Sequence, residues 1–228
     1  MTKKISLLLI LATVLGTHPL YGYPSSAKNS HQLSVGEPTG LSDIETGPEH
    51  SPEEIIKKAL QDLKSEDYAA RRNALSALAE LKAKEYSRNI AELLYDPDPR
   101  VRFVAAYAIG RLNAQEYAAD LIKLLKDKDA NVRFDAVRSL GEIQATEAAA
   151  EIAPLLKDPA EISKLEKIRA AMDCTVRGAA ATALGRLGAK RYSAQIKELL
   201  NDPESMVRRS AAEALEKLGS EEGAGHKE

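Results

Sequence analysis

The sequence predicts an all-α protein in which short helical hairpins stack into an α–α superhelix, that is, an α-solenoid. Segments of the chain align with one another at a spacing of 31 residues. Each aligned segment contains two apolar stripes at helical spacing, with cap and stop residues at the helix ends. Because one hairpin cannot bury both of its stripes alone, we expect the hairpins to stack and cover one another.

The composition is that of a chain that can bury a core and carries little net charge. Of 228 residues, 44% are hydrophobic and 29% are charged, which is ordinary for a globular protein. The net charge of -2 argues against a nucleic-acid partner, which would need a basic excess to neutralise phosphates. A single cysteine, and histidines only at 18, 31, 50 and 226, largely exclude a disulfide framework and most metal, haem and Ser-His-Asp sites. We expect no cofactor.

Residues 1–27 have the layout of a secretory signal peptide. Two lysines precede the apolar run Ile5–Leu15, which is shorter than the roughly 20 residues that a membrane span needs. Ser25 and Ala27 are the small residues that favour cleavage after position 27, and cleavage after Gly22 is the alternative. No cysteine near this segment could carry a lipid. We expect a periplasmic or extracellular protein with no membrane span after cleavage.

Residues 28–50 are expected to form a flexible, disordered linker. They mix Gly, Pro, Ser, Thr and charged residues without a helix or strand period. His31 and His50 lie in this segment, and we interpret them as solvated loop residues because nothing holds a second metal ligand near them.

Each repeat in residues 51–219 begins with an acidic residue predicted to cap its first helix. Side-chain oxygens at this position accept hydrogen bonds from the free N–H groups of a helix start. An arginine follows each acid by four residues, and its regularity favours hydrogen bonding to the cap acid of its own or an adjacent repeat over an anion-binding ladder. The acids are Asp67, Asp98, Asp129, Asp173 and Glu204, and the arginines are Arg71, Arg102, Arg133, Arg177 and Arg208.

The first helix of each repeat is predicted to bury one face. An alanine and a larger aliphatic residue recur four positions apart, and the alanine lets a neighbouring helix approach closely. Helix stops are expected at Asn113, Gln144, Gly188 and Gly219. The alanines are Ala74, Ala105, Ala136, Ala180 and Ala211, and the aliphatic residues are Leu78, Ile109, Leu140, Leu184 and Leu215.

The second helix of each repeat also carries one apolar stripe. An isoleucine or leucine precedes a Leu-Leu pair by one turn, and tyrosines at the helix start are interpreted as packing residues. The stripe consists of Ile90, Leu121, Ile152 and Ile196 with Leu93-Leu94, Leu124-Leu125, Leu155-Leu156 and Leu199-Leu200, and the tyrosines are Tyr86, Tyr117 and Tyr192.

These repeats resemble the short HEAT-like repeats of the phycobilisome lyase family. The resemblance rests on the Asp-Pro start with Val101 and Arg102, on Ala-rich first helices ending L-G-x-L or I-G-x-L, and on second helices ending L-L-x-D, and it covers residues 51–219. It implies a bilin lyase or isomerase component as an alternative function, although bilin attachment is cytoplasmic in that family. HEAT-like di-iron hydroxylases are set aside because their His-Glu pairs have no counterpart in this region.

The polar side of the second helices is the candidate binding surface, which we expect to line the concave face of the solenoid. A helical wheel places apolar Tyr95 and Ile122 among charged residues with a basic excess, which fits a protein or peptide partner. An ordinary solvated face is the alternative. The candidate residues are Arg88, Glu92, Tyr95, Ile122, Lys123, Lys126, Lys157 and Lys197, flanked by Pro154 and Glu198.

The repeat spacing breaks once, through an insertion near 159–172. Its apolar residues recur at helical spacing, so it is predicted to be an extra amphipathic helix or a lengthened first helix, whose apolar side folds back onto the solenoid or binds a partner. Pro154 just before it should kink the second helix. Cys174 is interpreted as an inert, partly buried thiol, with an intermolecular disulfide as the alternative.

No catalytic set of residues emerges from the sequence. The acids occupy cap and solvent positions, and no spacing isolates a pair in a pocket. We therefore predict a non-catalytic exported scaffold that binds a protein or peptide partner and no nucleic acid, with residues 220–228 as a disordered tail. The sequence leaves the oligomeric state open.

Overall fold

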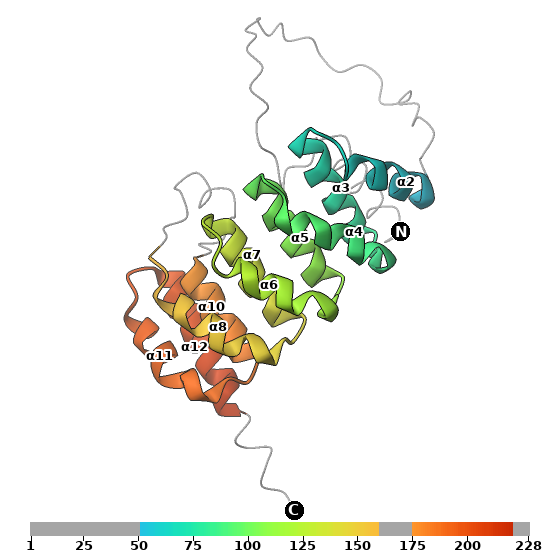
Figure 1. The fold of residues 1–228 in the computed structure, drawn as a ribbon. Coiled ribbons are helices and arrows are strands. Elements are labelled where there is room, and N and C mark those ends of the chain that lie inside the picture. Colours follow the sequence, from blue (N-terminus) through green and yellow to red (C-terminus); the bar gives the residue numbers. More distant parts are fainter. Residues whose placement is uncertain (1–50, 160–174, 221–228) are drawn as a thin grey trace, which may run out of the picture.

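The predicted all-helical architecture is confirmed in a computed structural model of the chain, which describes residues 51–159 and 175–220 (Figure 1). Within these ranges the chain forms helices and loops and contains no strand. The first helices of successive repeats are α3 (Tyr68–Glu80), α5 (Pro99–Arg111), α7 (Ala130–Glu142), α10 (Val176–Arg186) and α12 (Ser205–Ser220). The second helices are α4 (Ser87–Glu92), α6 (Ala118–Leu124), α8 (Ala149–Ile152) and α11 (Ser193–Glu198).

The first helices pack on one another in chain order, from α3 to α5, α7, α10 and α12. An additional helix, α2 (Pro52–Asp62), covers the free side of α3 and begins with a capping box between Ser51 and Glu54. Each second helix, with the turn that follows it, packs against the next first helix. The core is therefore one continuous cluster that runs through all the repeats, as stacking requires.

The two predicted apolar faces are largely buried, but Leu93 and Leu155 in the second-helix stripe are only partly buried, as are residues at the end of the array. All five alanines of the first-helix column are buried, and so are four of the five larger residues; Leu215 in α12 is only partly buried. Ile90, Leu121, Ile152 and Ile196 are fully buried in the second helices. Leu200 is 37% exposed, contrary to its predicted role in the stripe, because the described chain has no further repeat to cover it.

The second helices are shorter and tighter than a plain α-helix. Each is preceded by a 3₁₀ turn, and all except α6 are also followed by one. These turns are η1 (Lys84–Tyr86), η2 (Leu93–Tyr95), η3 (Gln115–Tyr117), η4 (Thr146–Ala148), η5 (Ala153–Lys157), η6 (Lys190–Tyr192) and η7 (Leu199–Asn201). The break predicted at Pro154 is confirmed, since α8 ends at Ile152 and η5 replaces it from Ala153. Tyr86, Tyr117 and Tyr192 close their 3₁₀ turns and pack against the core, which confirms their packing role.

The helix starts follow the predicted capping for three repeats. The side chains of Asp67, Asp98 and Asp129 accept hydrogen bonds from the first backbone N–H groups of α3, α5 and α7. The cap of α10 was predicted at Asp173, which lies outside the described residues; Thr175 fills this role by accepting from the N–H of Gly178. Glu204 directly precedes α12, and its carbonyl accepts from the N–H of Arg208.

The helix stops confirm three of the four predicted positions. Asn113, Gln144 and Gly188 adopt the left-handed conformation that ends a helix, and Lys82 does the same in the first hairpin. The helix stop predicted at Gly219 is wrong, because α12 continues through this residue to Ser220, which was predicted to begin the tail.

Glycines at matching positions of α5, α7 and α10 allow the first helices to approach closely. A Cβ on Gly185 would lie 2.8 Å from the Cα of Ala214, and one on Gly110 would lie 2.5 Å from Oγ of Ser139. Ser139 is itself buried and donates to the carbonyl of Ala106 in the neighbouring helix. These contacts set the distance between repeats.

We expect Gly185→Ala to lower the free energy of unfolding by about 1–3 kcal/mol, because the new methyl group meets the backbone of α12. Gly219→Ala is the matched control, since nothing lies within 4 Å of its Cβ position. The control should be neutral or stabilising by up to about 1 kcal/mol through helix propensity. Urea denaturation of both variants measures this, and equal effects would refute the close approach.

Several predicted features lie outside the described residues. They are the signal peptide at 1–27, the linker at 28–50, the insertion from 160 onward, Cys174 and the tail from 221 to 228.

Candidate functional site

The arginine column joins successive repeats, and its partner is not the predicted cap acid. Arg102 donates from Nε and Nη2 to the two carboxylate oxygens of Asp127, at 2.8 and 3.0 Å, and from Nη1 to the carbonyls of Asp96 and Pro97. The guanidinium therefore connects the loop before its own helix with the loop before the next first helix. The partner is the aspartate of the L-L-x-D ending, two residues before the next cap.

This arginine–aspartate bridge recurs with the same geometry in four repeats. Each aspartate of the bridge lies 25 residues after its arginine, and three of them also accept from the backbone N–H of the residue two positions later. The hydrogen bond to Asp96 raises the pKa of Arg71 above its ordinary value. The bridges are Arg71–Asp96, Arg102–Asp127, Arg133–Asp158 and Arg177–Asp202.

The hydrogen bond from the column arginine to a backbone carbonyl is kept across the insertion. Arg177 donates to the carbonyl of Asp158, 19 residues earlier, where the other repeats show a separation of six residues. The two ends of the inserted segment therefore lie as close together as the ends of an uninterrupted loop. This confirms the structural role predicted for the arginines and corrects their partner.

The candidate binding surface lies along the second helices and the turns that follow them. Seven of the eight predicted residues are exposed, and Ile122 is half-buried against the core. Tyr95 is 56% exposed, which is unusual for a large apolar side chain. The exposed residues are Arg88, Glu92, Tyr95, Lys123, Lys126, Lys157 and Lys197.

Tyr95 and Lys123, predicted from different repeats, are brought together by Asp120. The hydroxyl of Tyr95 donates to Oδ1 of Asp120, and Nζ of Lys123 donates to the same oxygen at 2.9 Å and to the Tyr95 oxygen at 3.1 Å. The hydrogen bond from Tyr95, opposed by burial and reinforced by Lys123, lowers the pKa of Asp120. The carboxylate therefore stays ionised at neutral pH and orients the exposed ring.

Two further lysines of this surface pair with acids of the next repeat. Nζ of Lys126 lies 3.7 Å from Glu151, and Nζ of Lys157 lies 3.8 Å from Glu198. The basic excess predicted for this surface did not count Asp120 and Glu151, which sit beside its lysines and nearly balance it. Asp120 lies one turn before Lys123 on the same helix, whereas Glu151 lies in the repeat after that of Lys126, so its pairing depends on how adjacent repeats stack.

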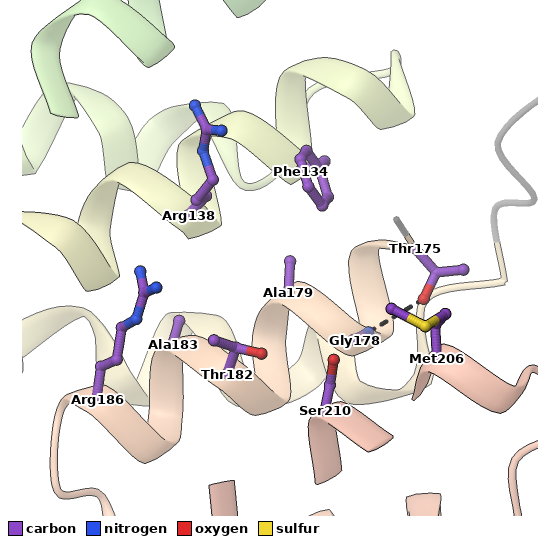
Figure 2. A pocket seen from close by; sticks show the side chains of 10 residues that line it. All are labelled: Phe134, Arg138, Thr175, Gly178, Ala179, Thr182, Ala183, Arg186, Met206 and Ser210. Carbon is purple, nitrogen blue, oxygen red and sulfur yellow. Dashed lines mark hydrogen bonds between the residues drawn. The ribbon is translucent and has the colours of Figure 1, made fainter. Parts of the chain in front are cut away.

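A groove on the first-helix side of the solenoid was not predicted. It encloses about 180 Å³ between α7, α10 and α12 (Figure 2). Phe134, Ala179 and Met206 supply apolar walls, and Arg138 and Arg186 both lie at one end. The periodic pattern predicts which residues are buried, but a groove between neighbouring helices also depends on how closely these helices pack.

Asp135 lies beside this groove and is mostly buried, with 14% of its side chain exposed. Burial raises its pKa to about 7, against the opposing charge of Arg138 at 3.1 Å and with a smaller contribution from Glu142. Between pH 4 and 7 the folded protein therefore holds a proton that the unfolded chain releases, so the free energy of unfolding falls as the pH rises through this range.

We expect Asp135→Asn to remove this fall and to be more stable than the parent protein by about 1–2 kcal/mol at pH 8, after the loss of the Arg138 pair is deducted. Thermal denaturation at pH 5 and pH 8 measures the difference. Asp98→Asn is the control. The hydrogen bond from Arg100 lowers the pKa of Asp98, so this variant should be less stable than the parent protein at pH 8. An Asp135→Asn variant that loses stability equally at both pH values would contradict the assignment.

Two further properties concern the described residues only. No helix among them is both long and apolar enough to cross a bilayer. In the same ranges, no three His, Cys, Asp or Glu side chains gather where they could hold a metal ion.

Stacked helical hairpins, bridged between repeats and carrying an exposed row of side chains on their second helices, define an α-solenoid repeat protein. The chain belongs to the family of HEAT repeats, whose model matches residues 54–119, 87–166 and 162–224. No curated protein sequence matches the chain.

Solved structures share this fold. The complex of CpcE and CpcF of phycocyanin lyase from Nostoc sp. PCC7120 is similar at 25% identity and a TM-score of 0.64, over 83% of this chain and 73% of that chain. An engineered protein is similar at 21% identity and a TM-score of 0.54, over 75% and 85% of the two chains. A second engineered protein gives 19% identity and a TM-score of 0.53, over 75% and 87%. The similarity to the two engineered proteins shows a shared fold and nothing about function.

Proposed function

We propose that this protein is an exported, non-catalytic scaffold that binds a protein partner through the second-helix surface centred on Tyr95, Ile122 and Lys123. The HEAT-repeat fold supports a protein-binding role in general. The observation that carries the choice of surface is the exposed ring of Tyr95, held in place from the next repeat by Asp120 and Lys123.

Preorganisation is the physical reason why this surface suits a partner. A tyrosine with few rotatable bonds, fixed by two hydrogen bonds, loses little conformational entropy when it is covered. Ile122 adds apolar area beside it. The paired lysines and acids form a polar rim that a partner with complementary charges can contact. Export through residues 1–27 is part of the proposal and rests on the sequence pattern alone.

We expect the triple variant Tyr95→Ala, Ile122→Ala, Lys123→Ala to recover at least about tenfold less partner than the parent protein, because anchors of this kind carry most of the binding energy. Crosslinking in the intact native cell, followed by affinity recovery and protein identification, measures this. The same preparation gives the N-terminal residue of the mature protein, which tests cleavage near residue 27.

Arg209→Ala with Glu213→Ala is the control, because this exposed ion pair lies on α12, away from the second-helix surface. The control should recover the partner as the parent does. Equal recovery by the triple variant would contradict the proposed surface.

A second candidate is a lyase-like role in bilin attachment, which the similarity to the phycocyanin lyase complex favours. The CpcE–CpcF structure is a complex of two proteins, so a protein partner is common to both candidates. Incubation of the mature protein with a bilin separates them. The scaffold role predicts an unchanged visible absorption spectrum, and a shifted, protein-bound band would favour the lyase role.

A further inference from the structure

The groove between α7, α10 and α12 is hollow because one repeat lacks a side chain that the others carry. The residue five positions after the cap is Gly178 in α10, whereas the other repeats have Arg72, Phe103, Phe134 and Arg209. Figure 2 shows Gly178 and Ala179 on the floor of the groove, between Phe134 on one side and Met206 on the other.

Packing does not require glycine at this position. A Cβ on Gly178 would lie 3.4 Å from the nearest atoms, the hydroxyl oxygens of Ser210 and Thr175, which is ordinary contact. By contrast, a Cβ on Gly185, two turns further along the same face of α10, would collide with the backbone of α12. Gly178 therefore opens space rather than avoiding a clash, and that space lies at the surface.

The charges of the groove are arranged on one side. Arg138 on α7 and Arg186 on α10 both lie at the end opposite Met206 and Thr175 (Figure 2). Arg138 already contacts Asp135 and stacks on the ring of Tyr107. Arg186 is exposed, and the described residues give it no ion pair. The groove therefore has an apolar floor, a rim of hydroxyl groups and a guanidinium available for an anion.

The size of the groove restricts what it can hold. Pockets for whole small molecules usually enclose about 300–1,000 Å³, and this one encloses about 180 Å³. That volume suits one large side chain of an extended chain. Arg186 suits a carboxylate a short distance along the same chain, because guanidinium groups bind carboxylates with two parallel hydrogen bonds.

We infer that this groove binds a peptide segment of a partner protein in which an acidic residue lies two positions before a large apolar one. The apolar side chain enters between Phe134 and Met206, and the carboxylate binds Arg186. This surface is on the first-helix side and is separate from the second-helix surface of the proposed function, so either can fail without the other.

The test is an NMR titration of the full mature chain with blocked peptides of defined sequence. The probe is acetyl-Ala-Asp-Ala-Phe-Ala-amide, compared with the same peptide carrying Lys for Asp or Ala for Phe. We expect saturable shifts of the amide signals of Gly178, Ala179 and Arg186 with the probe, and at least fivefold weaker binding of both comparison peptides.

Two variants separate binding from folding. Gly178→Phe restores the side chain of the other repeats and fills the groove, and Arg186→Glu reverses the charge at its end. Each should weaken binding of the probe at least tenfold while the helical circular dichroism and the melting temperature stay close to those of the parent. Lys190→Glu, a charge reversal in η6 outside the groove, should bind as the parent does.

Three results would overturn the inference. They are the absence of saturable shifts at millimolar peptide, equal binding of the Asp and Lys peptides, and groove signals that show another occupant before peptide is added. Contacts between Met206 and residues 160–174 would identify that occupant as this chain's own segment. Groove shifts that depend on protein concentration would identify it as a second copy.

Discussion

Asp96→Ala is expected to lower the free energy of unfolding by about 3–5 kcal/mol, because removing one partner of a buried ion pair leaves the other uncompensated. The Asp96 side chain is only 3% exposed. It accepts two hydrogen bonds from Arg71, at 2.7 and 2.9 Å, and a third from the backbone N–H of Asp98. After the substitution, Arg71 keeps its carbonyl partners at Ser65 and Glu66 but loses its counter-charge.

Arg208→Ala is the matched control, because it occupies the same column without an aspartate. Among the described residues Arg208 donates only to the exposed carbonyls of Asp202 and Pro203. Its removal should cost less than about 1 kcal/mol. Chemical denaturation of both variants gives the comparison. Similar losses would mean that the bridge does not join the repeats.

Leu140→Ala is the second substitution with a large expected effect, a loss of about 3–5 kcal/mol in the free energy of unfolding. Leu140 is fully buried near the middle of the array, where α7 packs against α5 on one side and α10 on the other. Removing its side chain leaves a cavity that both neighbours line. The loss should therefore appear in the unfolding of the whole array rather than of one end.

Leu215→Ala in the same column provides the comparison. Leu215 is only partly buried, because α12 has no further repeat beyond it in the described chain. We expect a loss of about 1 kcal/mol for this variant. If Leu215→Ala destabilised the protein as much as Leu140→Ala, burial would not depend on the neighbouring repeats in the way that stacking requires.

The fold could be predicted from the sequence because the same helical pattern recurs in every repeat. Alanines four residues before a larger aliphatic residue predicted the buried faces correctly, and aspartate caps were found at Asp67, Asp98 and Asp129. Two errors fall at the end of the described array, at Leu200 and Gly219, whereas Leu93 and Leu155 within it are only partly buried. Periodicity carries no information about where stacking stops.

The surface was harder to predict because it depends on distances between repeats. The wheel placed Tyr95 and Lys123 on one face but did not identify Asp120, which joins them. The repeat alignment likewise assigned Arg102 to a cap acid, although the second aspartate column of the L-L-x-D endings is equally regular. In both cases the residue types were visible in the sequence, and the choice between two nearby acids required the three-dimensional offset of adjacent hairpins.

A double-mutant cycle on Arg102 and Asp127 tests most directly whether successive hairpins lie side by side. Each residue is replaced by alanine, singly and together, and the free energy of unfolding of all four proteins is measured. Stacked repeats predict a coupling energy of about 1–3 kcal/mol between two residues that are 25 positions apart in the sequence. A coupling energy of zero would show that the arginine and the aspartate do not meet, and it would contradict the stacked arrangement.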